Sequence, residues 1–237
     1  MEQLRQELKI KGSRIYLRPI TIEDTECVVR WRNDKKVVEN FIYRKNISKE
    51  EHLNWFHNKV ETGDVIQFII CDNKTDKALG SIYLQNFNLE SRQAEEGIFL
   101  GEEEAYGRGI GTEAAALVLK YAFETLKLHK LTARVLSYNQ GSRRMHEKAG
   151  YVMESYLKDE LFLDGKYEDL ILLEDGTCSV DSNRYEMTYN TIESDYGREN
   201  FIFNYYKYRG YKDLDSLFND CVTKQLDKYE YESNVKK

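Results

Sequence analysis

The sequence predicts an α/β fold, with strands and helices mixed along a chain of 237 residues. Short stretches in which apolar and polar side chains alternate are typical of strands, and several occur before residue 174. Two other stretches open with Thr or Ser and carry an acidic residue three positions later, as many helices do. A glycine-rich turn then leads directly from a predicted strand into a predicted helix.

The N-terminal part is predicted to form one strand and two helices. Residues 14–20 (RIYLRPI) alternate and predict the strand. Thr21 is a suitable N-cap with Asp24 three residues later, so a helix is predicted to follow. Ser48 and Glu51 have the spacing of a capping box, which predicts a second helix start.

Three neighbouring strands are predicted next. Residues 65–72 (VIQFIICD) and 78–87 (ALGSIYLQNF) are rich in β-forming side chains and flank a short polar turn. This arrangement predicts an antiparallel hairpin. Residues 94–100 (AEEGIFL) predict a third strand beside the hairpin.

Two helices and three strands are predicted to follow. Asp164-Gly165 lies between two alternating stretches, and this dipeptide is a strong hairpin signal. Gly150 predicts the end of the second helix. The predicted elements are an amphipathic helix after the glycine turn, a strand at 130–138, a helix at 139–150 and a hairpin of strands at 151–163 and 166–173.

The composition changes near residue 175, which predicts two regions, 1–174 and 175–237. The second region holds nine of the 18 tyrosines, and residues 211–229 can be written as one amphipathic helix. Such a density of aromatic residues is not typical of disordered segments. The extension is therefore predicted to pack on the first region or in a homodimer interface.

Charge and composition argue against several classes of protein. A net charge of −6 and a pI near 5.5 argue against a general nucleic-acid binder. The charged N-terminal stretch and the lack of a long apolar run argue against a signal peptide and a membrane span, so a cytoplasmic location is expected. The scattered cysteines and histidines have no metal-ligand spacing, so no metal is predicted.

The glycine turn before the helix is a candidate anion site. Residues 105–123 read AYGRGIGTEAAALVLKYAF. A helix start has free N–H groups and a partial positive charge, and glycines allow an anion to approach them. Residues 107–112 are therefore either a diphosphate site or a tight structural turn. The stretch contains no Walker motif and lacks the other features of a Rossmann site.

Two motifs indicate a family. The turn Tyr106–Gly111 is similar to the pattern [QR]-x-x-G-x-[GA], with Tyr106 at the first position. Residues 139–151 (NQGSRRMHEKAGY) are similar to N-x-x-S-x-x-x-Y-E-K-x-G-F, with His146 where Tyr is common. With the order of elements around them, residues 12–174 resemble the GNAT superfamily of acyl-CoA N-acyltransferases.

The resemblance implies a mixed, mostly antiparallel sheet flanked by helices and splayed between its fourth and fifth strands, 95–100 and 131–137. Acetyl-CoA would lie in the splay as co-substrate. Its pantetheine arm would pair with the backbone of Ile98, Phe99 and Leu100, and Asn139 would meet the pantetheine amide from the other side. Its pyrophosphate would lie on the glycine turn, formed by Gly107, Arg108, Gly109, Ile110, Gly111 and Thr112.

Two side chains are candidates for acid–base chemistry. Glu95 and Glu96 point to opposite faces of a strand, so only one can face the splay. By its family position Glu95 is the expected proton acceptor for the amine, directly or through a water, with a structural carboxylate as the alternative. His146 occupies the place of the family tyrosine that protonates the CoA thiolate. It is expected either to do the same or to contribute packing or a CoA contact.

The resemblance implies that the acceptor meets the first two helices. Trp31 and Asn33 are the candidate contacts, although for Trp31 a core role is placed ahead of this contact. The stretches VRWRND and EEHLNWF resemble acetyltransferases of nucleotide-linked amino sugars, and FLDGKYED is shared with these and with spermidine acetyltransferases. A small-molecule amine is therefore expected, with amino sugar ahead of polyamine. The alternatives are a protein N-terminus, as in ribosomal-protein acetyltransferases, and non-catalytic acyl-CoA binding.

Overall fold

The computed structural model describes residues 8–176, so residues 1–7 and 177–237 lie outside the described part. The strands are β1 (Ile10–Lys11), β2 (Ile15–Pro19), β3 (Ile66–Asp72), β4 (Ala78–Asn88), β5 (Gln93–Leu100), β6 (Lys130–Leu136), β7 (Val152–Leu163) and β8 (Lys166–Gly176). The α-helices are α2 (Thr25–Arg32), α3 (Lys35–Val38), α4 (Lys49–Trp55), α5 (Ile110–Lys120) and α6 (Gln140–Ala149). The last strand thus passes the predicted boundary at residue 174, and the predictions for the tyrosine-rich extension concern residues outside the described part.

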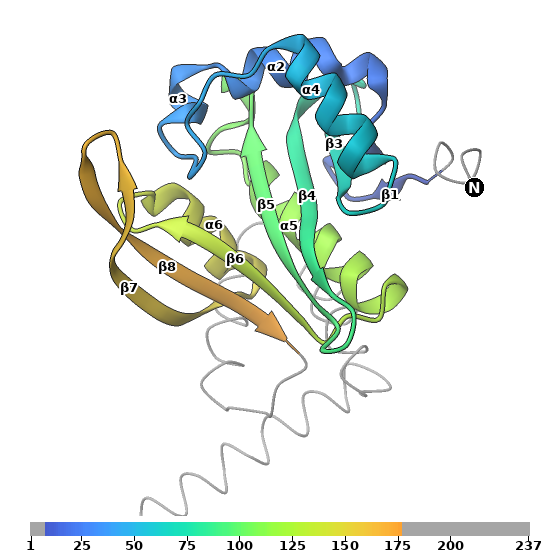
Figure 1. Ribbon diagram of the computed structural model, residues 1–237. Helices are drawn as coiled ribbons and strands as arrows, with labels where there is room; N and C mark the ends of the chain where they lie inside the picture. The colour runs from blue at the N-terminus through green and yellow to red at the C-terminus, as the bar shows by residue number, and fades with distance from the viewer. Residues whose placement is uncertain (1–7, 177–237) are drawn as a thin grey trace, which may run out of the picture. The chain divides into compact units, whose positions relative to one another are not determined.

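All eight strands form one sheet in the order β1-β2-β3-β4-β5-β6-β8-β7 (Figure 1). Every neighbouring pair is antiparallel except β5 and β6, which run parallel. The predicted hairpins, β3–β4 and β7–β8, are confirmed. In the second, Asp164 and Gly165 both have positive φ, 48° and 84°, as a two-residue hairpin turn requires.

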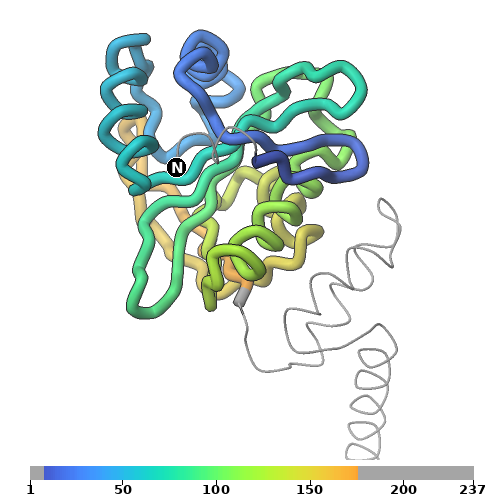
Figure 2. The backbone as a smooth tube through the Cα atoms, turned by 90° about the vertical axis from the view of Figure 1, so that its right-hand side faces the viewer, coloured from blue at the N-terminus to red at the C-terminus, as the bar shows by residue number. Residues whose placement is uncertain are grey.

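The helices form two groups, α2–α4 and α5–α6, which pack on the sheet (Figures 1 and 2). Side chains alternate along β3, so that Phe68 meets Tyr121 after α5, whereas Ile69 joins the core cluster around Trp31 of α2. The predicted mixed sheet flanked by helices is confirmed. None of the helices in residues 8–176 combines the length and the apolar character needed to cross a membrane.

Both predicted helix starts have the expected capping interactions. At Ser48, the side chain accepts the N–H of Glu51, and the Glu51 carboxylate accepts the N–H of Ser48. At Thr21, the Asp24 carboxylate accepts the backbone N–H at 2.8 Å. The Thr21 start differs from the prediction in that a 3-10 turn, Ile22–Asp24, precedes α2.

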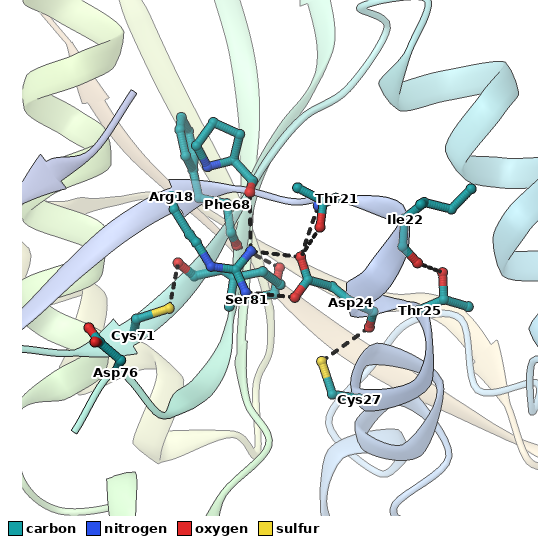
Figure 3. A network of polar contacts seen from close by, with 12 residues as sticks. Arg18, Thr21, Ile22, Asp24, Thr25, Cys27, Phe68, Cys71, Asp76 and Ser81 are labelled. Carbon is teal, nitrogen blue, oxygen red and sulfur yellow. Dashed lines mark hydrogen bonds and ion pairs between the residues drawn. The ribbon is translucent and has the colours of Figure 1, made fainter. Parts of the chain in front are cut away.

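Asp24 also anchors the start of this helix to β2. Two guanidinium nitrogens of Arg18 donate to its two oxygens at 2.7 Å each (Figure 3). Burial alone would raise the pKa of Asp24, but the hydrogen bonds from Arg18 and Thr21 outweigh it and hold this pKa below its ordinary value. The ionised carboxylate therefore stabilises the fold.

Asp24→Asn is expected to lower the free energy of unfolding at pH 7 by about 3 kcal/mol, because it leaves the half-buried Arg18 without its counter-charge. Since the folded pKa is lowered, this contribution is present above the unfolded value of about 3.9 and is lost as the pH falls through the folded value. Urea unfolding of both proteins between pH 7 and pH 3 should therefore give a difference that narrows in acid. Asp64→Asn, at an exposed ion pair with Lys59, is the control. A constant difference across this range would contradict the assignment.

Candidate active site

The sheet opens between its two parallel strands. Paired residues run only from Gln93 opposite Lys130 to Glu96 opposite Ala133. Beyond this point β5 continues to Leu100 and β6 to Leu136 without pairing to each other, and the strands diverge in Figure 1. The predicted splay is confirmed, and it leaves backbone edges of both strands available to a ligand.

The glycine turn ends in an uncapped helix start. Gly107 and Gly109 adopt left-handed φ angles of 70° and 72°, and no side chain caps α5 at Gly109. The first N–H groups of α5, from Ile110 to Thr112, therefore lack a side-chain acceptor at the cap. A Cβ atom added to Gly107 would meet no atom within 4 Å, so the turn is open on that side.

Arg14 of the chain before β2 holds this turn in place. Its Nη1 donates to the carbonyl of Arg108 at 2.7 Å, and its Nε donates to the Glu113 carboxylate at 2.9 Å. Gly111 has a different role, since a Cβ atom there would lie 3.1 Å from Met145 of α6. The glycines of the turn thus serve backbone geometry at positions 107 and 109 and close helix packing at position 111.

Asn139 caps α6. Its Oδ1 accepts the N–H of Ser142 at 3.0 Å. It lies just beyond the end of β6, on the far side of the opening from β5. The predicted contact between Asn139 and pantetheine stays a prediction, as do the contacts predicted for Ile98, Phe99 and Leu100 and for the glycine turn.

The carboxylate of Glu95 is fully engaged within the protein. Arg134 of β6 donates to both of its oxygens at 3.0 Å each. Gln85 and Asn86 of β4 add one hydrogen bond each, at 3.0 and 3.1 Å. These four bonds match the number of lone-pair sites on a carboxylate. For Glu95 to accept a proton, one of these four hydrogen bonds must therefore be replaced by a hydrogen bond to the amine or to a water.

Glu96 points to the opposite face, as the alternation of a strand predicts. There it forms a buried cluster with Tyr151, whose hydroxyl donates to it, and with His146 of α6. His146 is 3 % exposed, its Nδ1 lies 2.9 Å from the carbonyl of Ser142, and its Nε2 lies 3.5 Å from Glu96 Oε1. The two candidate acid–base residues, Glu95 and His146, are therefore on different faces of β5.

Trp31 and Asn33, the candidate acceptor contacts, are both held by the protein itself. Trp31 is 1 % exposed, and its indole N–H donates to Glu102 at 2.8 Å. Of its two predicted roles, the structure thus supports a place in the core. The side-chain amide of Asn33 is paired in both directions with the backbone of Ile47, at 2.8 Å each. Contact of either residue with an acceptor stays a prediction.

A family model described as an acetyltransferase (GNAT) domain matches residues 14–152, which include the glycine turn, the opening and all of α6. The chain belongs to the GNAT acetyltransferase family. It is accordingly an N-acetyltransferase in class.

Known GNAT proteins resemble this chain over most of its described part. The probable N-acetyltransferase YjcK of Bacillus subtilis is 30% identical over 168 residues, which are 68% of this chain and 92% of YjcK. Spermidine N(1)-acetyltransferase of Escherichia coli is 28% identical over 158 residues, or 66% of this chain and 83% of that protein. The crystal structure of spermidine N-acetyltransferase from Vibrio cholerae with CoA and spermine has a TM-score of 0.65 at 23% identity, covering 70% of this chain and 96% of that one.

The opening of this GNAT domain holds two residues that the sequence did not single out. Tyr83 of β4 lies opposite Gly97 of β5, the first residue beyond the β5–β6 pairing. A Cβ atom at Gly97 would come within 2.3 Å of the Tyr83 hydroxyl oxygen, so the phenol covers the glycine at the apex of the opening. Burial raises the pKa of Tyr83 to about 12, which keeps the phenol protonated. A glycine inside a predicted strand was the available signal for this close approach.

Arg32, at the end of α2, is the second such residue. Its guanidinium carbon lies 3.8 Å from the centre of the Phe41 ring, and the Phe41 ring packs edge-on against Phe99 of β5. Nη2 donates to the carbonyl of Tyr43 at 3.2 Å, whereas Nη1 is buried without a hydrogen-bond partner in the described part of the chain. No sequence signal separates Arg32 from the neighbouring Arg30, which pairs with Glu102.

Proposed function

We propose that this GNAT enzyme transfers the acetyl group of acetyl-CoA to the primary amine of a small molecule. The observation that carries the proposal is the opening between β5 and β6 together with the uncapped helix start of α5. A diphosphate fits a helix start whose cap is glycine, because both the N–H groups and the helix dipole favour an anion. The unpaired backbone edge of β5 suits an extended amide chain such as pantetheine.

The residues proposed for acetyl-CoA follow from this fit. The backbone N–H groups of residues 107–112 would receive the pyrophosphate, and the edge formed by Ile98, Phe99 and Leu100 would receive the pantetheine arm. Asn139 would contact the pantetheine amide from the β6 side. Acetyl-CoA supplies the activated acyl group, and the chain supplies its orientation.

The transfer forms a C–N bond and breaks the thioester C–S bond. The amine must first lose a proton, because an alkyl ammonium resembles Lys with a pKa near ~10.4. Glu95 is the proposed acceptor, after exchange of one hydrogen bond; the longest of its four, from Asn86, is the candidate. The thiolate leaves as the pair of electrons in the C–S bond moves to sulfur, and His146 is the proposed donor of its proton.

The acceptor proposed is a small-molecule amine, with a nucleotide-linked amino sugar ahead of a polyamine. The spermidine acetyltransferases among the relatives support a polyamine. The resemblance of residues 29–34 and 50–56 to amino-sugar acetyltransferases supports the other class. A protein N-terminus is the third candidate.

The proposal is tested by incubating the full chain with acetyl-CoA, a thiol-detecting dye and a panel of amines. The panel contains UDP-amino sugars, spermidine and short peptides. Release of CoA that depends on one class of amine, with the acetylated product found by mass spectrometry, is the expected result. Binding of acetyl-CoA without acetylation of any amine would contradict the enzymatic proposal and support an acyl-CoA-binding protein.

A matched pair of substitutions at Gly107 tests the pyrophosphate site. Asn and Asp have nearly the same shape, and both tolerate the left-handed backbone of this residue. Gly107→Asp is expected to raise the Kd of acetyl-CoA by roughly 10-fold relative to Gly107→Asn, because only Asp places a negative charge beside the helix start. Calorimetry on both folded variants measures the difference. Equal affinities would place the phosphates elsewhere.

A further inference from the structure

We propose that the acceptor carries an anionic group, phosphate or carboxylate, which Arg32 and Tyr83 select, so that polyamines are poor acceptors. This inference rests on the proposed function and specifies its substrate class. It depends on which polar groups around the opening are already paired within the protein and which are not.

Tyr83 is the polar group at the apex. Its hydroxyl lies against Gly97, where the β5–β6 pairing has just ended, and it has no hydrogen-bond partner among residues 8–176. Because the phenol stays protonated, it presents a neutral O–H donor to whatever enters. An oxyanion accepts from such a donor, whereas an ammonium ion cannot.

Arg32 adds a charge that the described residues do not neutralise. Its guanidinium has no ion pair in this part of the chain, and Nη1 is an unsatisfied donor. Leaving a buried charged donor unsatisfied costs free energy, which an anionic ligand would recover. The irregular segment 41–48 covers Arg32 through Phe41 and the Tyr43 carbonyl. The proposal therefore requires this segment to move aside before an anion can reach Nη1.

Two other arginines near the opening have carboxylate partners. Arg134 neutralises Glu95 through two hydrogen bonds, and Arg44 pairs with Asp164 of the β7–β8 turn. Arg44 also donates to Tyr138, whose own hydroxyl donates to the Glu39 carbonyl at 2.7 Å. Arg32 has no such partner among the described residues, so its positive charge would attract an anionic amine and repel the second and third ammonium groups of a polyamine.

The test compares matched amines that differ by one anionic group. The pairs are glucosamine with glucosamine 6-phosphate, ethanolamine with phosphoethanolamine, and β-alaninamide with β-alanine; spermidine is the polycation. The first two pairs test phosphate and the third tests carboxylate. For whichever anionic group the enzyme recognises, phosphate or carboxylate, kcat/KM of the anionic amine should exceed kcat/KM of its neutral partner by roughly 10-fold or more.

Substitutions then assign the preference to its residues. Arg32→Gln should reduce the anionic-to-neutral ratio to near one, and Arg32→Lys should retain part of it. Arg30→Gln is the control, because it removes a charge from the same helix at a residue already paired with Glu102. Since each variant is measured on the same pair of amines, differences in amine basicity cancel. Tyr83→Phe keeps the ring over Gly97 and should lower the ratio by removing only the hydroxyl.

Two outcomes would overturn the inference while leaving the enzymatic proposal intact. In the first, kcat/KM for spermidine exceeds that for every anionic amine. In the second, Arg32→Gln leaves the anionic-to-neutral ratio of kcat/KM unchanged. If no amine is acetylated, the enzymatic proposal fails. The anion site at Arg32 can then still be tested by calorimetry, with UDP titrated into the CoA-saturated protein. Binding of UDP to the wild type and its loss in Arg32→Gln would support an anion site. Equal binding by both, or none by the wild type, would overturn it.

Discussion

Glu95→Gln is expected to lower kcat/KM by roughly 100-fold or more while leaving the Kd of acetyl-CoA nearly unchanged. The amide keeps the size of the carboxylate, and its single carbonyl oxygen can still accept a hydrogen bond from Arg134, but it cannot take up a proton from the amine. Steady-state kinetics with the acceptor identified by the amine panel, together with calorimetry for acetyl-CoA, measures both quantities.

The ion pair with Arg134 requires its own control, because Glu95 also joins β5 to β6. Arg134→Gln removes the pair and leaves the carboxylate in place. If Glu95 acts on the amine, this variant keeps most of its activity. If the two variants lose activity to the same extent, Glu95 positions β6 through Arg134, and its role as proton acceptor is excluded.

The buried cluster of Glu96, His146 and Tyr151 is expected to give the largest effect on stability. Glu96→Ala should lower the free energy of unfolding by about 3 kcal/mol or more, because it leaves the Tyr151 hydroxyl without this acceptor and opens a cavity. Glu96 is 2 % exposed, so water cannot replace the lost partner without reorganising the core. Chemical unfolding monitored by circular dichroism is the measurement.

Glu96→Gln keeps the shape of the side chain and removes only its charge, because the glutamine carbonyl can still accept the hydrogen bond from the Tyr151 hydroxyl. If Glu96→Gln lowers the free energy of unfolding as much as Glu96→Ala does, the carboxylate charge itself is required beside His146. In the same series, His146→Ala should lower kcat and remove one limb of the pH profile if His146 protonates the thiolate. An unchanged profile would assign His146 to packing.

Much of the fold could be predicted because its signals lie in a few adjacent residues. The Asp164-Gly165 turn, the Ser48 capping box and the glycine turn before α5 are each encoded within five residues or so. The parallel pairing of β5 with β6 is different. It joins segments more than 30 residues apart, for example Glu96 with Ala133. The family resemblance predicted that these two strands are splayed neighbours in a mixed sheet, but their parallel direction was not predicted.

The site was predictable in part. Strand periodicity placed Glu95 and Glu96 on opposite faces, which the structure confirms. Their partners were not predictable, because Arg134 and Tyr151 reach them only through the sheet order and the position of α6. The sequence favours a core role over a stacking role for a tryptophan on a short helix, but only the tertiary packing around Trp31 decides between them. Gly97 signals a close approach but does not identify Tyr83 as the residue that makes it, and Arg32 differs from Arg30 only in its partners within the folded chain.

The packing of Trp31 on Gly101 links the two halves of the site. A Cβ atom at Gly101 would lie 2.0 Å from the indole, so the end of β5 and the helix that carries Arg32 fit together without a gap. A shift of β5 on binding acetyl-CoA would therefore be transmitted to the neighbourhood of the acceptor. Such coupling is reciprocal: whatever factor acetyl-CoA adds to acceptor affinity, the acceptor must add to the affinity for acetyl-CoA. The contact between the Trp31 indole and Gly101 is thus expected to carry part of this coupling between the two substrates.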